Sequence, residues 1–287
     1  MKNQESFLSE FDSILNSSAT LVPTKDLLSG FSHNSWENNL IIVDGNYFAG
    51  TASNKYKIVQ NEESLSPVLN AVCNYANENL GGDFSKIKVN THINEGSYFA
   101  KISLMDKFWG KGIDKMFKII SWQNSYNTQV PNRIFDMIGR LICENGLMRI
   151  AEKQIICNVK HTSKEVDTLN FDEMKIALNE IFGLAIDLSE QKKFNEISIM
   201  DIDTDVTEAY NSLIKGTIFP KRKIADALNI AQREAQILNS DVTLWLAYNA
   251  LNHVLNHDKT FKMKEQFRLQ TDEKIFKNAE KLYAEIV

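Results

Sequence analysis

The sequence predicts an α+β protein with a mostly antiparallel β-sheet in its N-terminal and central part and a helical C-terminal part. Before about residue 165, many apolar residues alternate with polar ones or form short runs between turn residues. From Phe171 onward, they follow the 3.6-residue period of an amphipathic helix. We therefore expect a sheet domain over residues 1–165 with a helical domain, 166–287, packed on it.

The first 80 residues combine helices with a hairpin. Phe7, Phe11 and Leu15 are spaced i, i+4, i+8, which predicts a short amphipathic helix. The Asp44-Gly45 pair lies between two apolar runs and predicts a hairpin turn. In chain order, we expect helices over 5–16 and 24–30, a hairpin over 40–50, a third strand over 55–60 and a helix over 63–80.

The central part is predicted to form strands. Between residues 86 and 93, Lys86, Lys88, Asn90 and His92 alternate with apolar residues and Thr91, so these four should share one exposed face of a sheet. Further strands are expected over 97–105, 115–123 and 153–161. The stretch 127–148 is ambiguous, because its apolar spacing fits a helix while Gly139 weakens one.

The C-terminal part contains three long apolar stripes at helical spacing. These stripes are Met174, Leu178, Ile181, Ala185; Ile224, Leu228, Ala231, Ala235, Leu238; and Leu244, Tyr248, Leu251, Leu255. A last helix is expected over 274–286. Four to six helices follow the sheet on this reading.

Composition excludes several classes of protein. The chain has 287 residues, of which 43% are apolar and 24% charged, as in an ordinary globular protein. No apolar run approaches the roughly 18–20 residues of a membrane span, and the polar start is no signal peptide. Cys73, Cys143 and Cys157 are odd in number and far apart, which indicates reduced thiols. We therefore expect a cytoplasmic protein without membrane contact.

Charge is distributed unevenly. Residues 86–164 contain 13 basic and 6 acidic side chains, whereas the rest of the chain contains 19 basic and 31 acidic ones. A basic middle in a protein of net charge −5 suggests a surface for an anion such as a nucleic-acid backbone. The alternative is that lysines only solvate the outer face of a sheet.

The basic region also contains aromatic residues, and cations with aromatic rings are typical of single-strand binding. Trp122 and Tyr126 are the preferred stacking candidates because they flank a polar run, Gln123-Asn124-Ser125. The full set of candidate nucleic-acid contacts is Lys86, Lys88, His92, Lys101, Lys111, Lys118, Trp122, Tyr126, Arg133 and Lys160.

Standard catalytic motifs are absent from the sequence. There is no phosphate-binding GxxxxGK[ST] loop, no HExxH, no GxSxG and no CxxC. His253 and His257 have the i, i+4 spacing that binds zinc, but no carboxylate or cysteine lies at a matching offset, which favours surface histidines. We expect no enzymatic activity, no cofactor and no metal.

An amide stripe on the helical side invites two interpretations. Trp245, Asn249, Asn252 and Asn256 lie along one face of a predicted helix. Such a stripe either docks inside the protein through buried hydrogen bonds, which we favour, or faces an external partner.

Five stretches of the chain resemble the phage/plasmid-like protein family of unknown function. They are residues 22–28, NSYN at 124–127, RLICENGL at 140–147, VKHT at 159–162 and TLWLAYNA at 243–250. The chain departs from the family pattern where Asn127-Thr128 replaces Asp-Gly and Lys160 replaces Arg. The resemblance implies a product of mobile elements, encoded beside replication, recombination and anti-restriction genes. Its motif residues here are Asn124, Arg140, Asn145, Gly146, His161, Trp245, Tyr248 and Asn249.

Arg140, Asn145 and Gly146 are expected to serve the fold first, with Asn145-Gly146 in a turn that needs positive φ.

Three functions remain open on the sequence. The first, which we prefer, is non-enzymatic binding of single-stranded nucleic acid, for protection or annealing in replication or recombination. The second is an anti-defence protein that binds and inhibits a host protein through the acidic remainder and the Trp/Asn stripe. The third is a hydrolase or nuclease, which the missing carboxylate–histidine constellation disfavours. A homo-oligomer is compatible with each.

Overall fold

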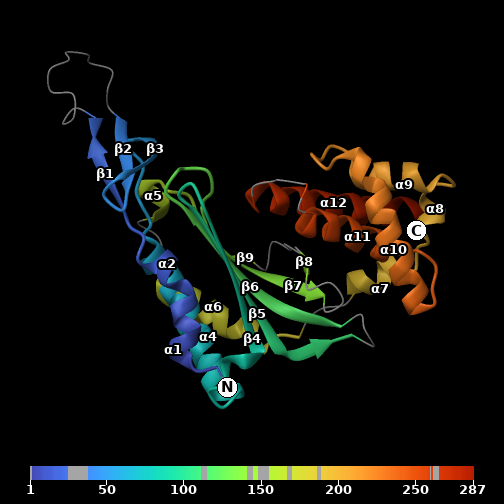
Figure 1. The fold of residues 1–287 in the computed structure, drawn as a ribbon, viewed down its shortest axis with the longest axis horizontal. Coiled ribbons are helices and arrows are strands. Elements are labelled where there is room, and N and C mark those ends of the chain that lie inside the picture. The colour runs from blue at the N-terminus through green and yellow to red at the C-terminus, as the bar shows by residue number, and fades with distance from the viewer. Residues whose placement is uncertain are drawn as a thin grey trace. The chain divides into compact units, whose positions relative to one another are not determined.

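The computed structural model describes residues 2–24, 38–110, 115–140, 145–147, 155–166, 170–185, 189–258, 260 and 265–287. Over this part the α+β prediction is confirmed, with two antiparallel sheets followed by helices (Figure 1). None of the helices in these ranges is long and apolar enough to cross a membrane. Residues 25–30 of the helix expected over 24–30 and the candidate residue Lys111 lie outside the described residues.

The chain forms two compact units, each assembled from separate stretches. Unit 1 contains Met1–Lys107, Lys118–Asp136 and Ala151–Leu184, and unit 2 contains Phe108–Phe117, Met137–Ile150 and Ala185–Val287. Strands cross from one unit to the other, so the units are interleaved along the sequence. The grouping therefore differs from the single boundary expected after residue 165, because the helix over 171–183 lies within unit 1.

The first sheet of unit 1 has three antiparallel strands in the order β1 (Ala19–Pro23), β2 (Asn38–Val43) and β3 (Tyr47–Ser53). The predicted hairpin is present between β2 and β3, and its turn uses left-handed φ angles of 51° at Asp44 and 74° at Gly45. The third strand is β1. Residues 55–60, expected to be that strand, make only an isolated bridge between Tyr56 and Thr162.

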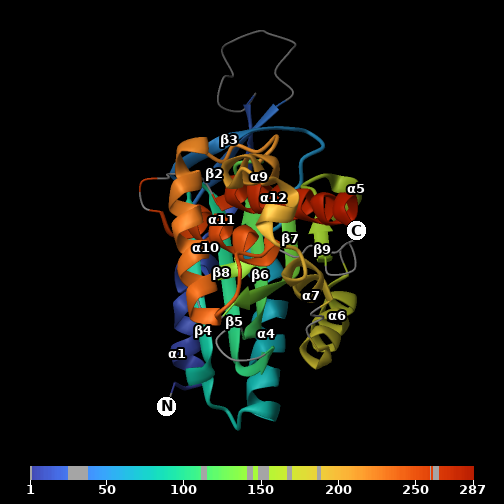
Figure 2. The same cartoon turned by 90° about the vertical axis from the view of Figure 1, so that its right-hand side faces the viewer.

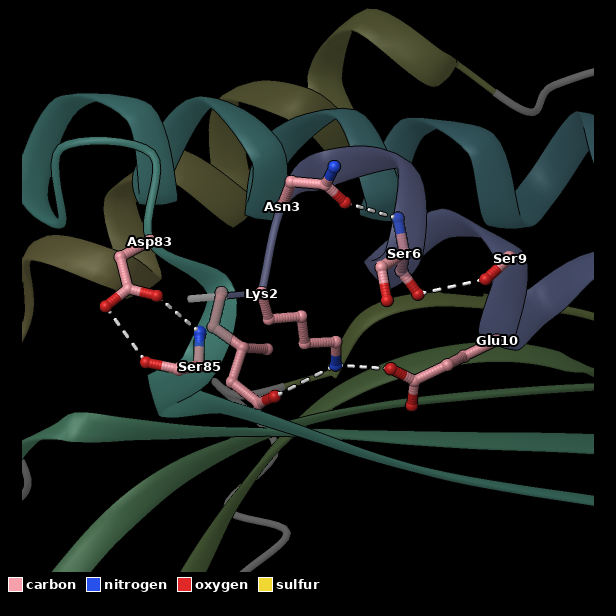
Figure 3. A network of polar contacts seen from close by, with 8 residues as sticks. Lys2, Asn3, Ser6, Ser9, Glu10, Asp83 and Ser85 are labelled. Atoms are coloured by element: carbon pink, nitrogen blue, oxygen red, sulfur yellow. Dashed lines mark hydrogen bonds and ion pairs between the residues drawn. The ribbon is translucent and has the colours of Figure 1, made fainter.

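The N-terminal helical segment begins at Gln4 and is tied to the start of the second sheet. It consists of α1 (Gln4–Leu8), a 3₁₀ turn η1 (Ser9–Phe11) and α2 (Asp12–Leu15). Lys2 pairs with Glu10 and donates to the carbonyl of Ile87, the first residue of β4 (Figure 3). Asp83 caps the adjacent 3₁₀ turn η2 (Phe84–Lys86) by accepting from Ser85 (Figure 3). The bond from Lys2 to Ile87 joins the two segments where the strand begins.

The second sheet has six antiparallel strands that run in the order β4-β5-β6-β7-β8, with β9 also paired to β7. Their bounds are β4 Ile87–Asn94, β5 Ser97–Trp109, β6 Met116–Ser125, β7 Asn132–Arg140, β8 Asn145–Leu147 and β9 Ile155–Val159. The ambiguous stretch 127–148 therefore contains strands where it is described. Asn145 and Gly146 lie in β8 opposite Arg140 and Gly139, so the turn expected there is wrong.

Two helices pack on one face of this sheet within unit 1. They are α4 (Asn61–Asn79) and α6 (Phe171–Gly183), and they also contact each other (Figures 1 and 2). A short helix, α5 (Ser163–Val166), precedes α6. The buried core includes Leu65, Val72, Ile102 and Leu178. Alternate residues of the strands and one stripe of each helix supply this core, as their periodicities predict.

Unit 2 contains the remaining helices, so the described part of residues 171–287 has seven α-helices, more than the four to six expected. They are α7 (Ser189–Asn195), α8 (Ile199–Ile202), α9 (Val206–Leu213), α10 (Ile224–Leu238), α11 (Leu244–His257) and α12 (Glu265–Ile286), besides α6. α10 and α11 pack together, and α12 packs on α11 and α9. The core of unit 2 includes Tyr210, Ala231, Leu251 and Ile275.

Candidate nucleic-acid interface

The edge strand β4 presents polar side chains on one face. Lys88, Asn90 and His92 are exposed, whereas Ile87 is buried and Val89 half-buried. The predicted alternation is therefore present over most of the strand. Ile93 departs from it, because its side chain is exposed near the end of the strand. Lys86 is also exposed, but it ends the 3₁₀ turn before β4 and is not part of the strand.

The neighbouring strand β5 extends this face. Asn90 lies directly opposite Lys101, and Lys88 opposite Ser103. Because directly opposed residues of an antiparallel pair point the same way, these four residues and His92 form one surface, called here the β4–β5 face. Lys88 and Lys101 are diagonal neighbours on the two strands, an arrangement in which the two Cα atoms are usually about 7–8 Å apart. A strand of this length spans about 26 Å, which gives an extended track of polar side chains with two lysines close together.

Lys118 does not lie on this surface. Its side chain is 3% exposed, and its ammonium group donates to the backbone carbonyl of Ile181 in α6. Burial lowers the pKa of Lys118, and the nearby Asp136 only partly opposes this effect. The expectation that Lys118 contacts nucleic acid is therefore wrong for this structure, because β6 turns that residue toward the helices.

Trp122 and Tyr126 are likewise fully buried, so their rings cannot stack on a base. The indole nitrogen of Trp122 donates to Ser64 Oγ at 3.1 Å. The Tyr126 hydroxyl accepts from the backbone N–H of Asn61 at 2.9 Å and donates to the carbonyl of Ser17 at 3.1 Å. Both rings instead join β6 and the residues after it to the start of α4.

The other two described cations of the predicted set lie away from the β4–β5 face. Arg133 is half-buried on β7 and donates from Nε to Asn158 on β9 at 2.8 Å. Lys160 follows β9 and is exposed. β5 and β6 separate both strands from β4 in the sheet order. Of the predicted basic residues that the structure describes, it therefore gathers Lys88, His92 and Lys101, with Lys86 adjacent.

Two exposed aromatic residues on β3 were missed by sequence reasoning. Tyr47 and Phe48 are 44% and 55% exposed. Burial raises the pKa of the Tyr98 hydroxyl, and the nearby Tyr47 also contributes to this rise. Tyr98 lies opposite Ile93 in the register of β4 and β5. Tyr47 therefore lies near Tyr98 on β5, whereas Phe48, the next residue of β3, points to the opposite face of that strand. The sequence signal was their position directly after the Asp44-Gly45 turn, where a hairpin end is solvated.

The motif residue Asn124 belongs to a buried hydrogen-bond network at the start of α4. Its amide nitrogen donates to Val59 O and to Asn61 Oδ1, both at 2.8 Å. Asn61 in turn donates to Ile14 O. On the neighbouring strand, Asn132 donates to Ser64 Oγ at 2.8 Å. These bonds connect the N-terminal helices, α4, β6 and β7, so Asn124 fixes the packing of unit 1.

The motif residues of unit 2 are buried as well. Arg140 is fully buried and forms an ion pair with Glu234 on α10. Burial, followed by the nearby Glu234, raises the pKa of the Tyr210 hydroxyl on α9. The Tyr248 hydroxyl donates to Asp272 on α12 at 3.0 Å. β7, α9, α10, α11 and α12 thus contribute polar groups to the interior of unit 2.

The Trp/Asn stripe of α11 is internal, in agreement with the interpretation favoured above. Trp245, Asn249 and Asn252 are buried, and Asn256 is half-buried. Asn252 donates to Asp272 at 2.7 Å, and Asn249 donates to the carbonyl of Trp245 one turn earlier. The stripe is therefore not available as a surface for a host protein, which corrects that part of the anti-defence hypothesis.

His161 is a buried imidazole in unit 1. It is 6% exposed and stacks on Tyr56 with ring centroids 5.2 Å apart. Neither ring nitrogen has a hydrogen-bond partner among the described residues. Burial lowers the pKa of His161 to about 4, so the ring is neutral near pH 7. This environment makes it a packing residue.

The described cysteines and acidic residues offer little reactive chemistry. Cys73 and Cys157 are free, buried thiols. Burial raises the pKa of both, to about 11 for Cys157, so the unreactive thiol form predominates at neutral pH. Within the described ranges, no three His, Cys, Asp or Glu side chains come together to hold a metal ion.

A comparison with protein families gives one match. The family described as "Domain of unknown function (DUF932)" matches residues 49–280, which include most of β3, β4 to β9 and most of the helical part. No curated protein and no solved structure matches the chain. Since the family match covers well over half of the sequence, the protein belongs to the DUF932 family.

Proposed function

We propose that this protein binds single-stranded nucleic acid, without catalysis, through the β4–β5 face. The observation that carries the proposal is the register of β4 and β5, which places Lys88, Asn90, His92, Lys101 and Ser103 on one surface. Lysines neutralise phosphates without regard to sequence, and amide and hydroxyl groups add hydrogen bonds to the backbone. Such a surface favours a flexible polyanion over a small ligand.

The exposed rings of Tyr47 and Phe48 supply the second element of single-strand recognition. Bases of a single strand are free to stack on aromatic side chains, which is independent of base identity. Both rings are exposed at the hairpin end of β3, where they offer an apolar contact separate from the polar track. We place the protein in replication or recombination of a phage or plasmid, in the cytoplasm of its host, where single strands need protection or annealing.

The salt dependence of binding tests the proposal directly. Affinity for a labelled dT oligonucleotide of about 30 residues should fall with log[salt] at about −0.7 per phosphate neutralised. Replacing Lys86, Lys88 and Lys101 together by Ala should flatten this slope by up to about two units. Fluorescence anisotropy over a salt series measures both quantities.

A matched control uses three exposed lysines elsewhere, Lys175, Lys192 and Lys281. Their replacement by Ala removes the same charge but should leave the slope unchanged. Equal slopes in the two triple variants would contradict the assignment to the β4–β5 face. No binding by the folded wild type at about 50 mM salt, where non-specific contacts are strong, would end the proposal and direct attention to a protein partner.

A further inference from the structure

A pocket in unit 1 lies where the C-terminal ends of α4 and α6 meet β5. Its volume is about 340 Å³, within the range of small-ligand sites. The pocket is lined by Tyr75 and Glu78 of α4, Asn179 and Phe182 of α6, and Lys107 of β5, among others. All of the lining residues belong to unit 1, and none of them belongs to the β4–β5 face.

Glu78 and Lys107 give this pocket opposite charges. Both side chains are exposed, and among the residues that the structure describes neither forms an ion pair. The ammonium group of Lys107 lies over the ring of Tyr75, 5.5 Å from its centroid, in a contact that uses none of its three N–H donors. A ligand that carries charges of both signs can satisfy both side chains, whereas an ion of one sign is repelled by one of them.

The two helix ends determine where each charge of such a ligand is favoured. Glu78 lies in the last turn of α4, and Gly183, which also lines the pocket, is the last residue of α6. Because the C-terminal end of a helix carries a partial negative charge, a cation is favoured beside Glu78 and an anion beside Lys107. The carboxamides of Asn74 and Asn179 also line the pocket, and within the described ranges their side chains form no hydrogen bonds. They can therefore donate to the anion and accept from the cation.

Tyr75 and Phe182 give the pocket an apolar floor. Both residues are buried, and their ring centroids are 5.0 Å apart. The Tyr75 hydroxyl donates to Asp106 at 2.5 Å, which fixes the position of the ring. The pocket thus combines a fixed apolar surface with two opposite charges and two carboxamides.

We propose that this pocket binds a free α-amino acid. Its carboxylate pairs with Lys107, its ammonium group pairs with Glu78, and an apolar side chain packs on Tyr75 and Phe182. An α-amino acid is the simplest molecule with both charges next to an apolar group. Because the pocket and the β4–β5 face share no residue, this proposal does not depend on the binding of single strands.

Thermal unfolding of the full-length protein with each common L-amino acid at about 10 mM tests the pocket, because a ligand of the folded state raises the melting temperature. We expect a rise with at least one amino acid that has an apolar side chain. Calorimetric titration of that amino acid should give one site per chain. Its methyl ester lacks the carboxylate charge and its N-acetyl form lacks the ammonium charge, so each should bind at least tenfold more weakly.

Two substitutions in the pocket have matched controls on α6. Glu78→Gln and Lys107→Gln should each weaken binding at least tenfold, whereas Glu180→Gln and Lys175→Gln, exposed and outside the pocket, should bind as the wild type does. Because Glu78 and Lys107 are exposed, both pocket variants should keep the melting temperature of the ligand-free wild type. The proposal is overturned if no amino acid raises the melting temperature of the wild type, or if either pocket variant keeps the wild-type affinity. An ester or N-acetyl form that binds as tightly as the free amino acid also overturns it.

Discussion

Polar residues are exposed on the edge strand of the second sheet but buried on its central strand. On the edge strand β4, polar residues alternate with apolar ones and point to solvent. On the central strand β6, every residue from Met116 to Ser125 is buried, including Lys118 and Asn124. Lys118 and Asn124 of β6 are bonded to α6 and α4, whereas Lys88, Asn90 and His92 of β4 are exposed. The position of a strand within the sheet therefore decides whether a polar side chain supports the fold or a surface.

The family residues fall on the buried side of this comparison. Asn124 and His161 in unit 1, and Arg140, Trp245, Tyr248 and Asn249 in unit 2, are all buried. Asn124, Arg140 and Tyr248 contact other elements of their unit through side-chain hydrogen bonds or an ion pair. The lysines of the β4–β5 face belong to none of the motif stretches. Substitution of the two groups should therefore affect different properties, namely stability in the first and binding in the second.

The largest loss of stability is expected at the buried ion pair of unit 2. Arg140→Met leaves Glu234 buried without its cation, which should lower the free energy of unfolding by about 3–5 kcal/mol. Urea unfolding measures the loss. The double variant Arg140→Met with Glu234→Leu should lose less than the single variant, because replacing both charges by apolar groups leaves no buried charge unpaired. A single-variant loss below about 1 kcal/mol would contradict a structural role.

A smaller, pH-dependent loss is expected at His161. Its pKa is about 4 in the folded protein and about 6.5 when unfolded, so the unfolded chain binds more protons between these values. The stability from the neutral ring is complete above about pH 6.5 and is lost as the pH falls toward 4. The total is on the order of 3 kcal/mol. His161→Phe keeps a ring against Tyr56 and should remove this part of the acid dependence, measured by melting curves from pH 7 to 4. If the melting temperature of His161→Phe depended on pH as that of the wild type does, the assignment of this acid dependence to His161 would be wrong.

Much of the fold follows from sequence periodicity, but the central strands do not. The alternation over residues 86–92 predicts β4 because one face of that strand is solvated. β7 gives no such signal, since both of its faces are covered, and its Ile134 and Ile138 have a spacing that also fits a helix. Trp122 and Tyr126 resemble surface residues in the sequence because polar residues lie beside them. In the fold these residues are buried and form hydrogen bonds with residues distant in the chain, which local sequence patterns do not reveal.

The smallest effect on stability, and a specific effect on binding, is expected at the exposed end of β3. Phe48 is 55% exposed, so Phe48→Ala removes little packing and should change the free energy of unfolding by no more than about 0.5 kcal/mol. If the ring stacks on a base, the variant should lose roughly 1–3 kcal/mol of binding to the dT oligonucleotide. The salt slope should stay constant, because stacking releases no counterions, in contrast to the lysine variant. Anisotropy at several salt concentrations, beside a melting curve, separates the two contributions. Wild-type affinity in Phe48→Ala would confine the binding surface to the lysines of β4 and β5.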